Sequence, residues 1–278
     1  MSVSIHSDQN LVEEFRANRG NLGGRFADSR ILLLTSTDSA GAKHTTPVAY
    51  LQDGLGRLLV IASADSAGSP PAWYQHIVSE PNVEVETGSF TFPAETIALE
   101  AEERQEAFDR AAEADHRLAD EQARTASLIP VLVLNPLGGR PNGDTWSESL
   151  KIIHDAFRRE LRLLRKEIAA SGPRLGAQLR INCLSLCAGL GHHHTMEDSG
   201  MLPAVDRSHP ELADATRRLR EEHQAVKLLL EELQRVVSTA NPDPVVLLAD
   251  VERLTSEVEN HLDYEEQQLF PILDTLTP

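Results

Sequence analysis

The second half of the chain carries long stretches with helical periodicity, and proline and glycine separate them. The stretches cover about residues 145–171, 174–200, 210–239 and 243–270. The breaks fall at Ser171-Gly-Pro173, from Gly200 through His209-Pro210, and at Asn241-Pro-Asp-Pro244, and Pro271 is expected to end the last helix. Short connections between long helices place consecutive helices antiparallel. The pattern therefore predicts an all-α up-down-up-down four-helix bundle.

The first half follows a different pattern. Short β-rich runs begin at Ile31, Leu58, Val83 and Val131, and one acidic helix is expected over about residues 100–123. The segment NPLGGRPNG, residues 135–143, breaks any regular element between the halves. We expect an α+β chain, with a small β-barrel over residues 1–136, a linker over 137–143 and the bundle over 144–278.

Composition and charge narrow the classes of partner. The chain has 26 Lys and Arg against 43 Asp and Glu, a formal charge of -17, which repels phosphate backbones and anionic membrane surfaces. No apolar run approaches the ~20 residues that a membrane span needs, and the N-terminus lacks the pattern of a secretory signal. We expect a cytoplasmic protein that binds no nucleic acid. Cys183 and Cys187, four apart on one predicted helix, are interpreted as core residues.

Each of the predicted helices of the second half carries a histidine, and two carry a glutamate four residues later. These pairs are His193 with Glu197 and His261 with Glu265, and residues four apart share one helix face. His154 and His223 lie on the other two helices, and antiparallel packing brings all four levels together. Imidazole suits iron, zinc and copper, and carboxylates can bridge two cations. The pattern predicts a dinuclear centre, with iron as the expected metal.

These motifs resemble the hemerythrin HHE cation-binding family over about 135 residues. The resemblance is carried by His193-His-Thr-Met-Glu-Asp198, Leu202-Pro203, Glu222-His223, His261-Leu-Asp-Tyr-Glu-Glu266 and Leu269-Phe-Pro271. It implies the metal ligands His154, His193, Glu197, His223, His261 and Glu265, with His194 and Glu266 as additional or alternative ligands. Oxygen-carrying members place a histidine four residues after the third-helix ligand, where this chain has Lys227. Fewer nitrogen ligands argue against reversible oxygen carriage, but iron could still bind dioxygen, peroxide or nitric oxide.

The first half resembles the deazaflavin (coenzyme F420)-dependent nitroreductase family over about residues 10–136. The motifs are Gly24-Arg-Phe26, Ile31-Leu-Leu-Leu-Thr35, Thr45-Thr-Pro-Val48, Ile61-Ala-Ser63, Pro71-Ala-Trp-Tyr74 and Ile129-Pro-Val-Leu-Val-Leu134. The resemblance implies a split β-barrel that binds the reduced coenzyme, passes a hydride to quinones or nitroaromatics, and can form a homodimer. The residues implied in cofactor binding are Lys43, His44, Thr46, Pro47, Ala62, Ser63, Trp73, Tyr74 and His76. No catalytic residue is assigned.

Two loops that in this family grip the anionic coenzyme are altered here. The first reads Asp38-Ser-Ala-Gly-Ala-Lys-His44, the second reads Ala62-Ser-Ala-Asp-Ser-Ala-Gly68, and residues 20–136 hold 8 Lys and Arg against 17 Asp and Glu. Two hypotheses therefore stay open. The chain is either a deazaflavin-dependent oxidoreductase of the nitroreductase or quinone reductase type that works with a diiron centre, or a non-enzymatic sensor or store of iron, oxygen or nitric oxide with a degenerate barrel.

Overall fold

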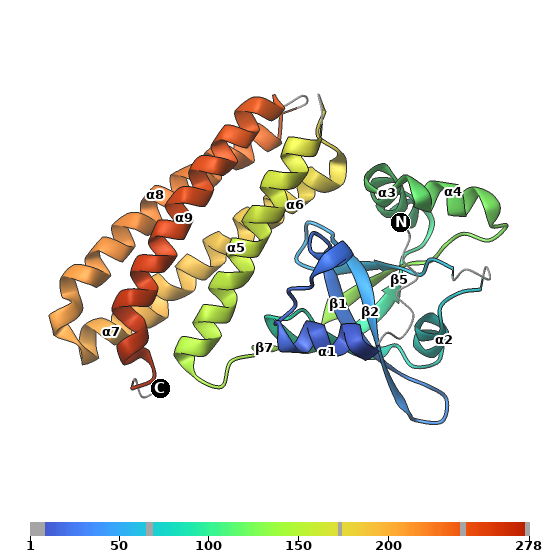
Figure 1. The fold of residues 1–278 in the computed structure, drawn as a ribbon, viewed down its shortest axis with the longest axis horizontal. Coiled ribbons are helices and arrows are strands. Elements are labelled where there is room, and N and C mark those ends of the chain that lie inside the picture. The colour runs from blue at the N-terminus through green and yellow to red at the C-terminus, as the bar shows by residue number, and fades with distance from the viewer. Residues whose placement is uncertain (1–8, 65–68, 172–173, 240–242, 276–278) are drawn as a thin grey trace. The chain divides into compact units, whose positions relative to one another are not determined.

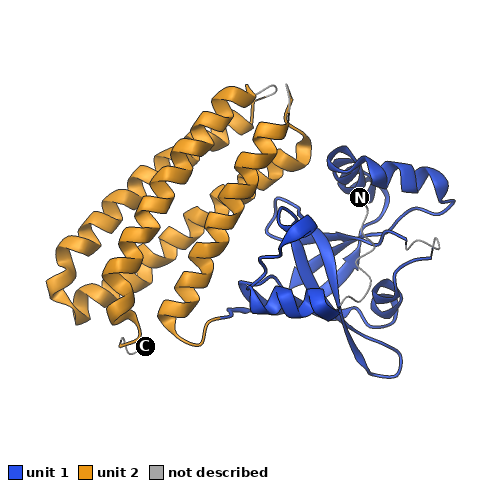
Figure 2. Ribbon diagram, viewed as in Figure 1, with its two compact units in different colours: residues 1–142 blue, residues 143–278 orange. Residues whose placement is uncertain are grey.

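The computed structural model describes residues 9–64, 69–171, 174–239 and 243–275. The chain divides into two compact units, Met1–Asn142 and Gly143–Pro278 (Figure 2). Strands build the first unit and helices build the second (Figure 1). Among the described residues, no helix combines the length and the apolar character that crossing a bilayer requires.

The first unit is a closed antiparallel barrel, as the sequence predicts. Its strands are β1 (Ile31–Thr37), β2 (Lys43–Gln52), β3 (Leu58–Ile61), β4 (Asn82–Glu86), β5 (Phe90–Ala98) and β6 (Val131–Pro136). They pair in the order β4-β1-β2-β3-β6-β5, and β4 also pairs with β5, so the sheet closes on itself. Closure leaves these six strands without an unpaired edge.

Alternation along β1 distributes its side chains between two apolar clusters. Leu32 and Leu34 belong to the main barrel cluster together with Trp73. Ile31 and Leu33 point the other way and pack with residues of α1 (Gln9–Ala17). The strand is therefore buried on both faces, which explains why it reads as one continuous apolar run rather than an alternating one.

The remaining helices of this unit are η1 (Gly24–Phe26), α2 (Ala72–Ser79), α3 (Ala101–Ala114) and α4 (His116–Arg124). The single acidic helix predicted over 100–123 is thus wrong in one respect, because the chain breaks at Asp115. Asp115 is extended, and its side chain accepts a hydrogen bond from the backbone N–H of Arg117, which caps α4. The buried Arg104 donates from Nε and a terminal nitrogen to the carbonyl of Ile129 and so ties α3 to the segment before β6.

The segment expected as a linker contains a short strand, β7 (Arg140–Pro141), which pairs with the start of β5. The side-chain amide of Asn142 donates to the carbonyl of Gly88 at 3.0 Å. These contacts explain why the first compact unit extends to Asn142.

The second unit is a helical bundle (Figure 1), as predicted. Its elements are α5 (Trp146–Ala170), α6 (Ala177–Met196), the π-helical turn η2 (Glu197–Met201), α7 (Leu202–Ser208), η3 (Pro210–Leu212), α8 (Ala213–Val237) and α9 (Pro244–Leu273). The breaks expected at Gly172-Pro173 and Asn241-Pro242 lie outside the described residues.

Two predicted helix ends are wrong. The chain does not break at Gly200 but continues through η2 into α7, where the fully buried Leu202 and Val205 hold it against the bundle. Pro271 does not end α9, which runs on to the buried Leu273. Proline removes a backbone hydrogen bond, but only the last turn is affected, and the burial of Leu273 favours continuing the helix.

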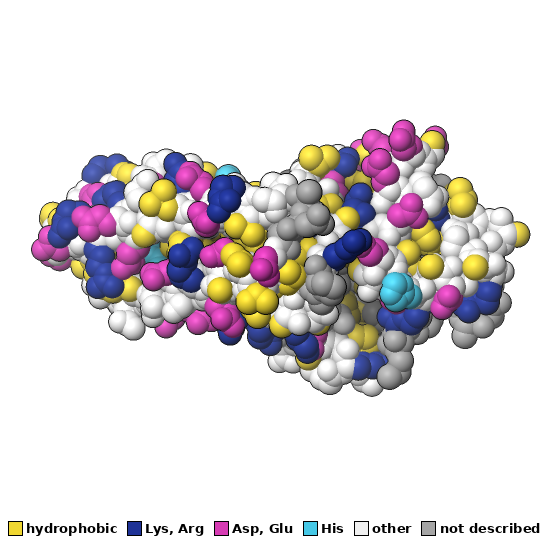
Figure 3. All heavy atoms as spheres, turned by 90° about the horizontal axis from the view of Figure 1, so that it is seen from above, with side chains coloured by type: hydrophobic (Ala, Val, Ile, Leu, Met, Phe, Trp, Pro, Cys, Tyr) yellow, Lys and Arg dark blue, Asp and Glu magenta, His cyan; other side chains and the backbone are white. Residues whose placement is uncertain are grey.

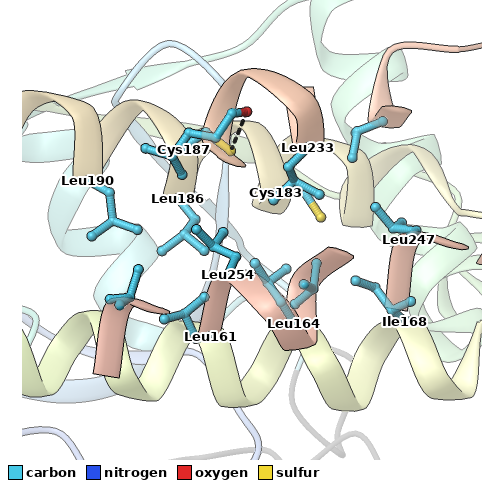
Figure 4. Close-up of a cluster of buried hydrophobic side chains, with 14 of the residues drawn as sticks. Leu161, Leu164, Ile168, Cys183, Leu186, Cys187, Leu190, Leu233, Leu247 and Leu254 are labelled. Carbon is cyan, nitrogen blue, oxygen red and sulfur yellow. Dashed lines mark hydrogen bonds between the residues drawn. The ribbon is translucent and has the colours of Figure 1, made fainter. Parts of the chain in front are cut away.

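Apolar side chains fill one end of the bundle (Figure 4). Leu161, Leu164 and Ile168 of α5 face residues of α6 and α9 in this cluster. Cys183 and Cys187 are buried members of the same cluster, which confirms their interpretation as core residues. A second apolar cluster fills the other end and contains Leu150, Leu202, Val205, Leu219, Leu269 and Leu273.

Candidate metal centre

A polar layer lies between the two apolar clusters of the bundle. Along α5 the order is Leu150, His154, then Leu161, and along α8 it is Leu219, His223, then Val226, so on both helices a histidine lies between members of the two clusters. The layer consists of His154, His193, His194, Glu197, His223, His261 and Glu265, all of them buried. Apolar packing on both sides shields this layer from water.

The layer contains two groups of side chains whose polar atoms converge. The three-histidine group is His194, Glu197, His223 and His261, and the two-histidine group is His154, His193, Glu197 and Glu265. Within each group, one ligand atom from every residue lies within 4.8 Å of all the others. Glu197 belongs to both groups, so one carboxylate can bridge two metal ions.

The glutamates lie between the histidines of both groups. Glu197 Oε1 is 3.1 Å from His193 Nε2, and Glu197 Oε2 is 3.4 Å from His223 Nε2. Glu265 Oε2 is 3.5 Å from His154 Nε2 and 3.8 Å from His261 Nε2. Each carboxylate therefore reaches histidines of both groups, which is the arrangement that a dinuclear centre requires.

The atoms of this layer that could bind a metal ion have no hydrogen-bond partner within the described part of the chain. The buried atoms are the Nε2 nitrogens of the five histidines and both carboxylate oxygens of Glu197 and Glu265. Buried polar atoms are nearly always paired, because an unpaired one costs about 1–3 kcal/mol. So many unpaired ligand atoms that face one another are expected of a metal-binding site, and the mixture of imidazole and carboxylate suits iron.

Burial sets the proton state of the layer before any metal is considered. It lowers the pKa of His154, His193, His194 and His223, and it lowers the pKa of His261 to about 4. It raises the pKa of Glu197 and Glu265. Neutral imidazoles are ready to coordinate, and two cations would supply the positive charge that favours ionised glutamates.

A ring of carboxylates lies outside the histidines. His154 Nδ1 donates to Glu266 Oε1 at 3.0 Å, and His223 Nδ1 donates to Asp198 Oδ1 at 2.8 Å. His261 Nδ1 donates to Glu222 Oε2 at 3.0 Å. Such contacts hold an imidazole in the tautomer that presents Nε2 to a metal.

The structure refines the ligand set that the sequence predicts. His154, His193, Glu197, His223, His261 and Glu265 converge, and His194 joins them. Glu266, the other additional candidate, instead bonds the outer nitrogen of His154. The supporting roles of Asp198 and Glu222 were not predicted. An acid directly after the inward-facing Glu197 was a signal that could have indicated Asp198, whereas Glu222 supports a histidine of another helix and gives no such local signal.

Lys227 is exposed on α8, and His194 takes a place beside His223. The three-histidine group therefore draws its third imidazole from α6, and the number of nitrogen ligands stays a prediction. His192, which precedes the two inward-facing histidines, is exposed.

The turn that carries Glu197 and Asp198 is π-helical. Thr195 Oγ1 donates to the carbonyl of Gly191, and Ser199 Oγ donates to the carbonyl of Thr195, both at 2.7 Å. Such turns occur often at functional sites in helices. Here the wider turn carries both the shared glutamate and the carboxylate that supports His223.

Aromatic rings border the two-histidine group. The ring of Phe157 lies 5.3 Å from the ring of His193, and the ring of Phe270 stacks 6.4 Å from that of His154. This side of the layer is consequently apolar and restricts water.

In the barrel unit, the candidate cofactor residues cluster only in part. His44 Nε2 bonds Asp38 Oδ2 at 2.7 Å, and the His44 ring lies 4.9 Å from that of His76. His76 Nδ1 in turn lies 3.0 Å from the hydroxyl oxygen of the buried Ser36. The altered hairpin loop is thus organised around an acid, whose pKa falls to about 2 through the hydrogen bond with His44.

The other candidate cofactor residues differ in how far their side chains are buried. Lys43 is exposed, Thr46, Ser63 and Tyr74 are half-buried, and Pro47, Ala62 and Trp73 are buried. Trp73 and Tyr74 meet edge to face with centroids 6.3 Å apart. The rest of the second altered loop, residues 65–68, lies outside the described residues.

Charge is mixed on the face of the molecule seen in Figure 3. Lysine and arginine side chains alternate there with acidic ones over the helical unit. Exposed charged residues of the helical unit form pairs along one helix, such as Arg217 with Glu221 at 3.0 Å. Such exposed pairs contribute little to stability and indicate a solvated surface.

Comparison with known proteins adds family assignments for both units. The hemerythrin HHE cation-binding domain family matches residues 145–273. The F420H(2)-dependent quinone reductase family matches residues 9–136.

Individual relatives match the barrel unit. A putative F420H(2)-dependent quinone reductase of Mycobacterium tuberculosis is 26% identical over 106 residues, which cover 38% of this chain and 88% of the relative. A second F420H(2)-dependent quinone reductase of the same species is 28% identical over 125 residues, covering 43% and 83% respectively. A solved F420-H2-dependent reductase is 31% identical with a TM-score of 0.34, covering 38% of this chain and 94% of that one.

Proposed function

Because this chain joins a domain of the F420H(2)-dependent quinone reductase family to a hemerythrin HHE cation-binding domain, we propose that it is a redox protein whose helical unit holds two iron ions. The observation that carries this proposal is the set of buried, unpaired donor atoms in two groups that share Glu197. Dioxygen, peroxide and nitric oxide are the proposed ligands of this centre.

Each residue of the layer has a distinct role in the proposal. Glu197 and Glu265 would supply carboxylate ligands that reach histidines of both groups, and the five imidazoles would bind the ions through Nε2. The apolar clusters and Phe157 exclude water. Bound iron would supply one-electron chemistry, and the buried carboxylates balance its charge.

Metal content of the purified protein tests this proposal. We expect close to two irons per chain after anaerobic reconstitution, with an absorption band of an oxo-bridged pair. His193→Ala or His261→Ala should strip most of the metal, because each removes a ligand and leaves a carboxylate poorly neutralised. His192→Ala is the matched control, since His192 is exposed in the same histidine run. Full iron in the two ligand variants, or none in the wild-type protein, would refute the assignment.

For the barrel unit, the family implies coenzyme F420, the names of its relatives point to quinone-like substrates, and the resemblance to nitroreductases adds nitro substrates as a proposal. The described residues fit the coenzyme poorly at its anionic end. In the hairpin 38–44, Asp38 engages His44, and the other basic residue of the hairpin, Lys43, is exposed.

Titration of the protein with reduced and oxidised F420, monitored by the fluorescence of the coenzyme, distinguishes an oxidoreductase from a sensor or store. Saturable binding that Trp73→Ala or His76→Ala weakens would support an oxidoreductase. Leu55→Ala serves as the control, because Leu55 is exposed in the turn between β2 and β3. Iron binding without F420 binding would favour a sensor or store with a degenerate barrel.

Homodimerisation through the barrel is a further proposal, drawn from the family resemblance. Light scattering after size exclusion measures the mass directly. A mass twice the 30.6 kDa of the chain would support it, and a mass of one chain at micromolar concentration would refute it.

A further inference from the structure

The outer carboxylates are distributed unequally between the two groups of ligands. In the three-histidine group, Asp198 supports His223 and Glu222 supports His261. In the two-histidine group, Glu266 supports His154. Because an ionised carboxylate only accepts hydrogen bonds, each contact places the ring proton on Nδ1 and leaves the Nε2 lone pair facing inward.

The outer carboxylates also differ in how strongly each raises the basicity of the histidine that it contacts. Glu266 accepts both the His154 ring N–H and a guanidinium N–H of Arg158, at 2.7 Å, on the same oxygen Oε1. Glu222 divides its contacts, since Oε2 accepts from His261 and Oε1 accepts from Arg218 at 2.7 Å. An oxygen shared with a cation gives less electron density to the imidazole, so Glu266 raises the basicity of its histidine least.

We propose that Asp198 and Glu222 make the three-histidine group load first with a divalent metal ion, and that Glu266 controls the loading of the second ion. This rests on the proposed dinuclear function. The three acids act through the histidines and are positioning residues rather than ligands. The third imidazole, His194, adds to the same preference, because it gives the first site one more nitrogen donor.

Cobalt(II) titration of the metal-free protein tests the order of loading. Calorimetry gives the affinity of each step, and proton NMR detects the paramagnetically shifted, exchangeable Nδ1–H resonances of bound histidines. We expect Asp198→Asn and Glu222→Gln to weaken the first step roughly 10- to 100-fold and to change resonances that appear with the first equivalent. Glu266→Gln should weaken only the second step and change a resonance that appears with the second equivalent.

The amide variants keep an acceptor oxygen and lose the charge, so the histidines should remain in place while their basicity falls. Controls come from neighbouring exposed acids. Asp263→Asn removes one of the two further carboxylate partners of Arg158, the other being Asp155, and Glu221→Gln removes the acid that precedes Glu222. Both should load like the wild-type protein, and circular dichroism confirms that every variant is folded.

The outcomes separate this inference from the function on which it rests. If the wild-type protein binds no cobalt, both fail. If two ions bind, but Glu266→Gln weakens the first step or Asp198→Asn and Glu222→Gln leave it unchanged, only the order of loading is wrong.

Discussion

The rings of His194 and His223 stack with centroids 4.4 Å apart and planes 12° apart, although they belong to α6 and α8. His194 also meets the ring of His261 edge to face at 5.1 Å. One helix therefore contributes consecutive histidines to different groups, with His193 in the two-histidine group and His194 in the three-histidine group. The third nitrogen of that group comes from α6 rather than from the position of Lys227.

His194→Ala should remove a ligand of the three-histidine group and lower iron content toward one ion per chain. Adding Lys227→His to this variant should not restore the metal, because position 227 is exposed whereas the ligand atoms of the layer are buried. Elemental analysis of both variants measures the effect. Recovery of two irons in the double variant would show that α8, not α6, supplies the third nitrogen.

Leu164→Ala should destabilise the bundle without changing its metal stoichiometry. Leu164 is fully buried in the apolar cluster that lies apart from the polar layer, so the truncation should cost about 2–5 kcal/mol of unfolding free energy. Denaturant unfolding measures the unfolding free energy, and iron analysis of the same sample measures the metal stoichiometry. Leu228→Ala, at a position 67% exposed, should change the unfolding free energy by less than about 0.5 kcal/mol.

The contact between Ser147 and Asp274 should make stability depend on pH. The backbone N–H and hydroxyl of Ser147 donate to the Asp274 carboxylate at 2.9 and 2.6 Å, joining the start of α5 to the end of α9. The hydrogen bond from the Ser147 side chain is the main cause of the lowered pKa of Asp274. A lowered pKa stabilises the fold above the ordinary carboxyl pKa, and the contribution is lost as the pH falls through the folded-state pKa.

Asp274→Ala should therefore lower the melting temperature at pH 7, and the difference from the wild-type protein should shrink below about pH 4. Asp214→Ala is the control, because that carboxylate is 98% exposed on α8. Thermal unfolding across pH 3 to 7 measures both variants. A constant difference over this range would contradict the assigned role of the carboxylate.

Cys187 should resist alkylation in the folded protein. Burial raises the pKa of its thiol to about 12, and the sulfur lies 3.9 Å from the Leu230 carbonyl as a hydrogen-bond donor. At pH 8 the reactive thiolate is therefore scarce as well as inaccessible. Mass spectrometry after iodoacetamide treatment should show an unmodified Cys187 in the native protein and a modified one in guanidinium. Rapid labelling without denaturant would show that this end of the bundle opens.

Local periodicity was enough to predict much of the centre. Four-residue spacing on a helix places His193 with Glu197, and His261 with Glu265, on one face whatever surrounds them. The breaks at proline and glycine defined the bundle for the same reason, because they act on the nearest backbone bonds. The β-rich runs likewise predicted a barrel, since alternation and turns are properties of neighbouring residues.

What the sequence by itself determined is therefore the helical and β-rich halves and the facing of residue pairs within one helix. Only the tertiary structure decided that Glu265 turns inward while the adjacent Glu266 bonds His154, and that Asp198 reaches His223 on another helix. It also decided that the chain stays helical past Gly200 and that residues 140–141 join the barrel. The reason is physical. The rotation of each helix about its axis, and the pairing of a short strand, are set by packing against segments distant in the chain, which local patterns do not encode.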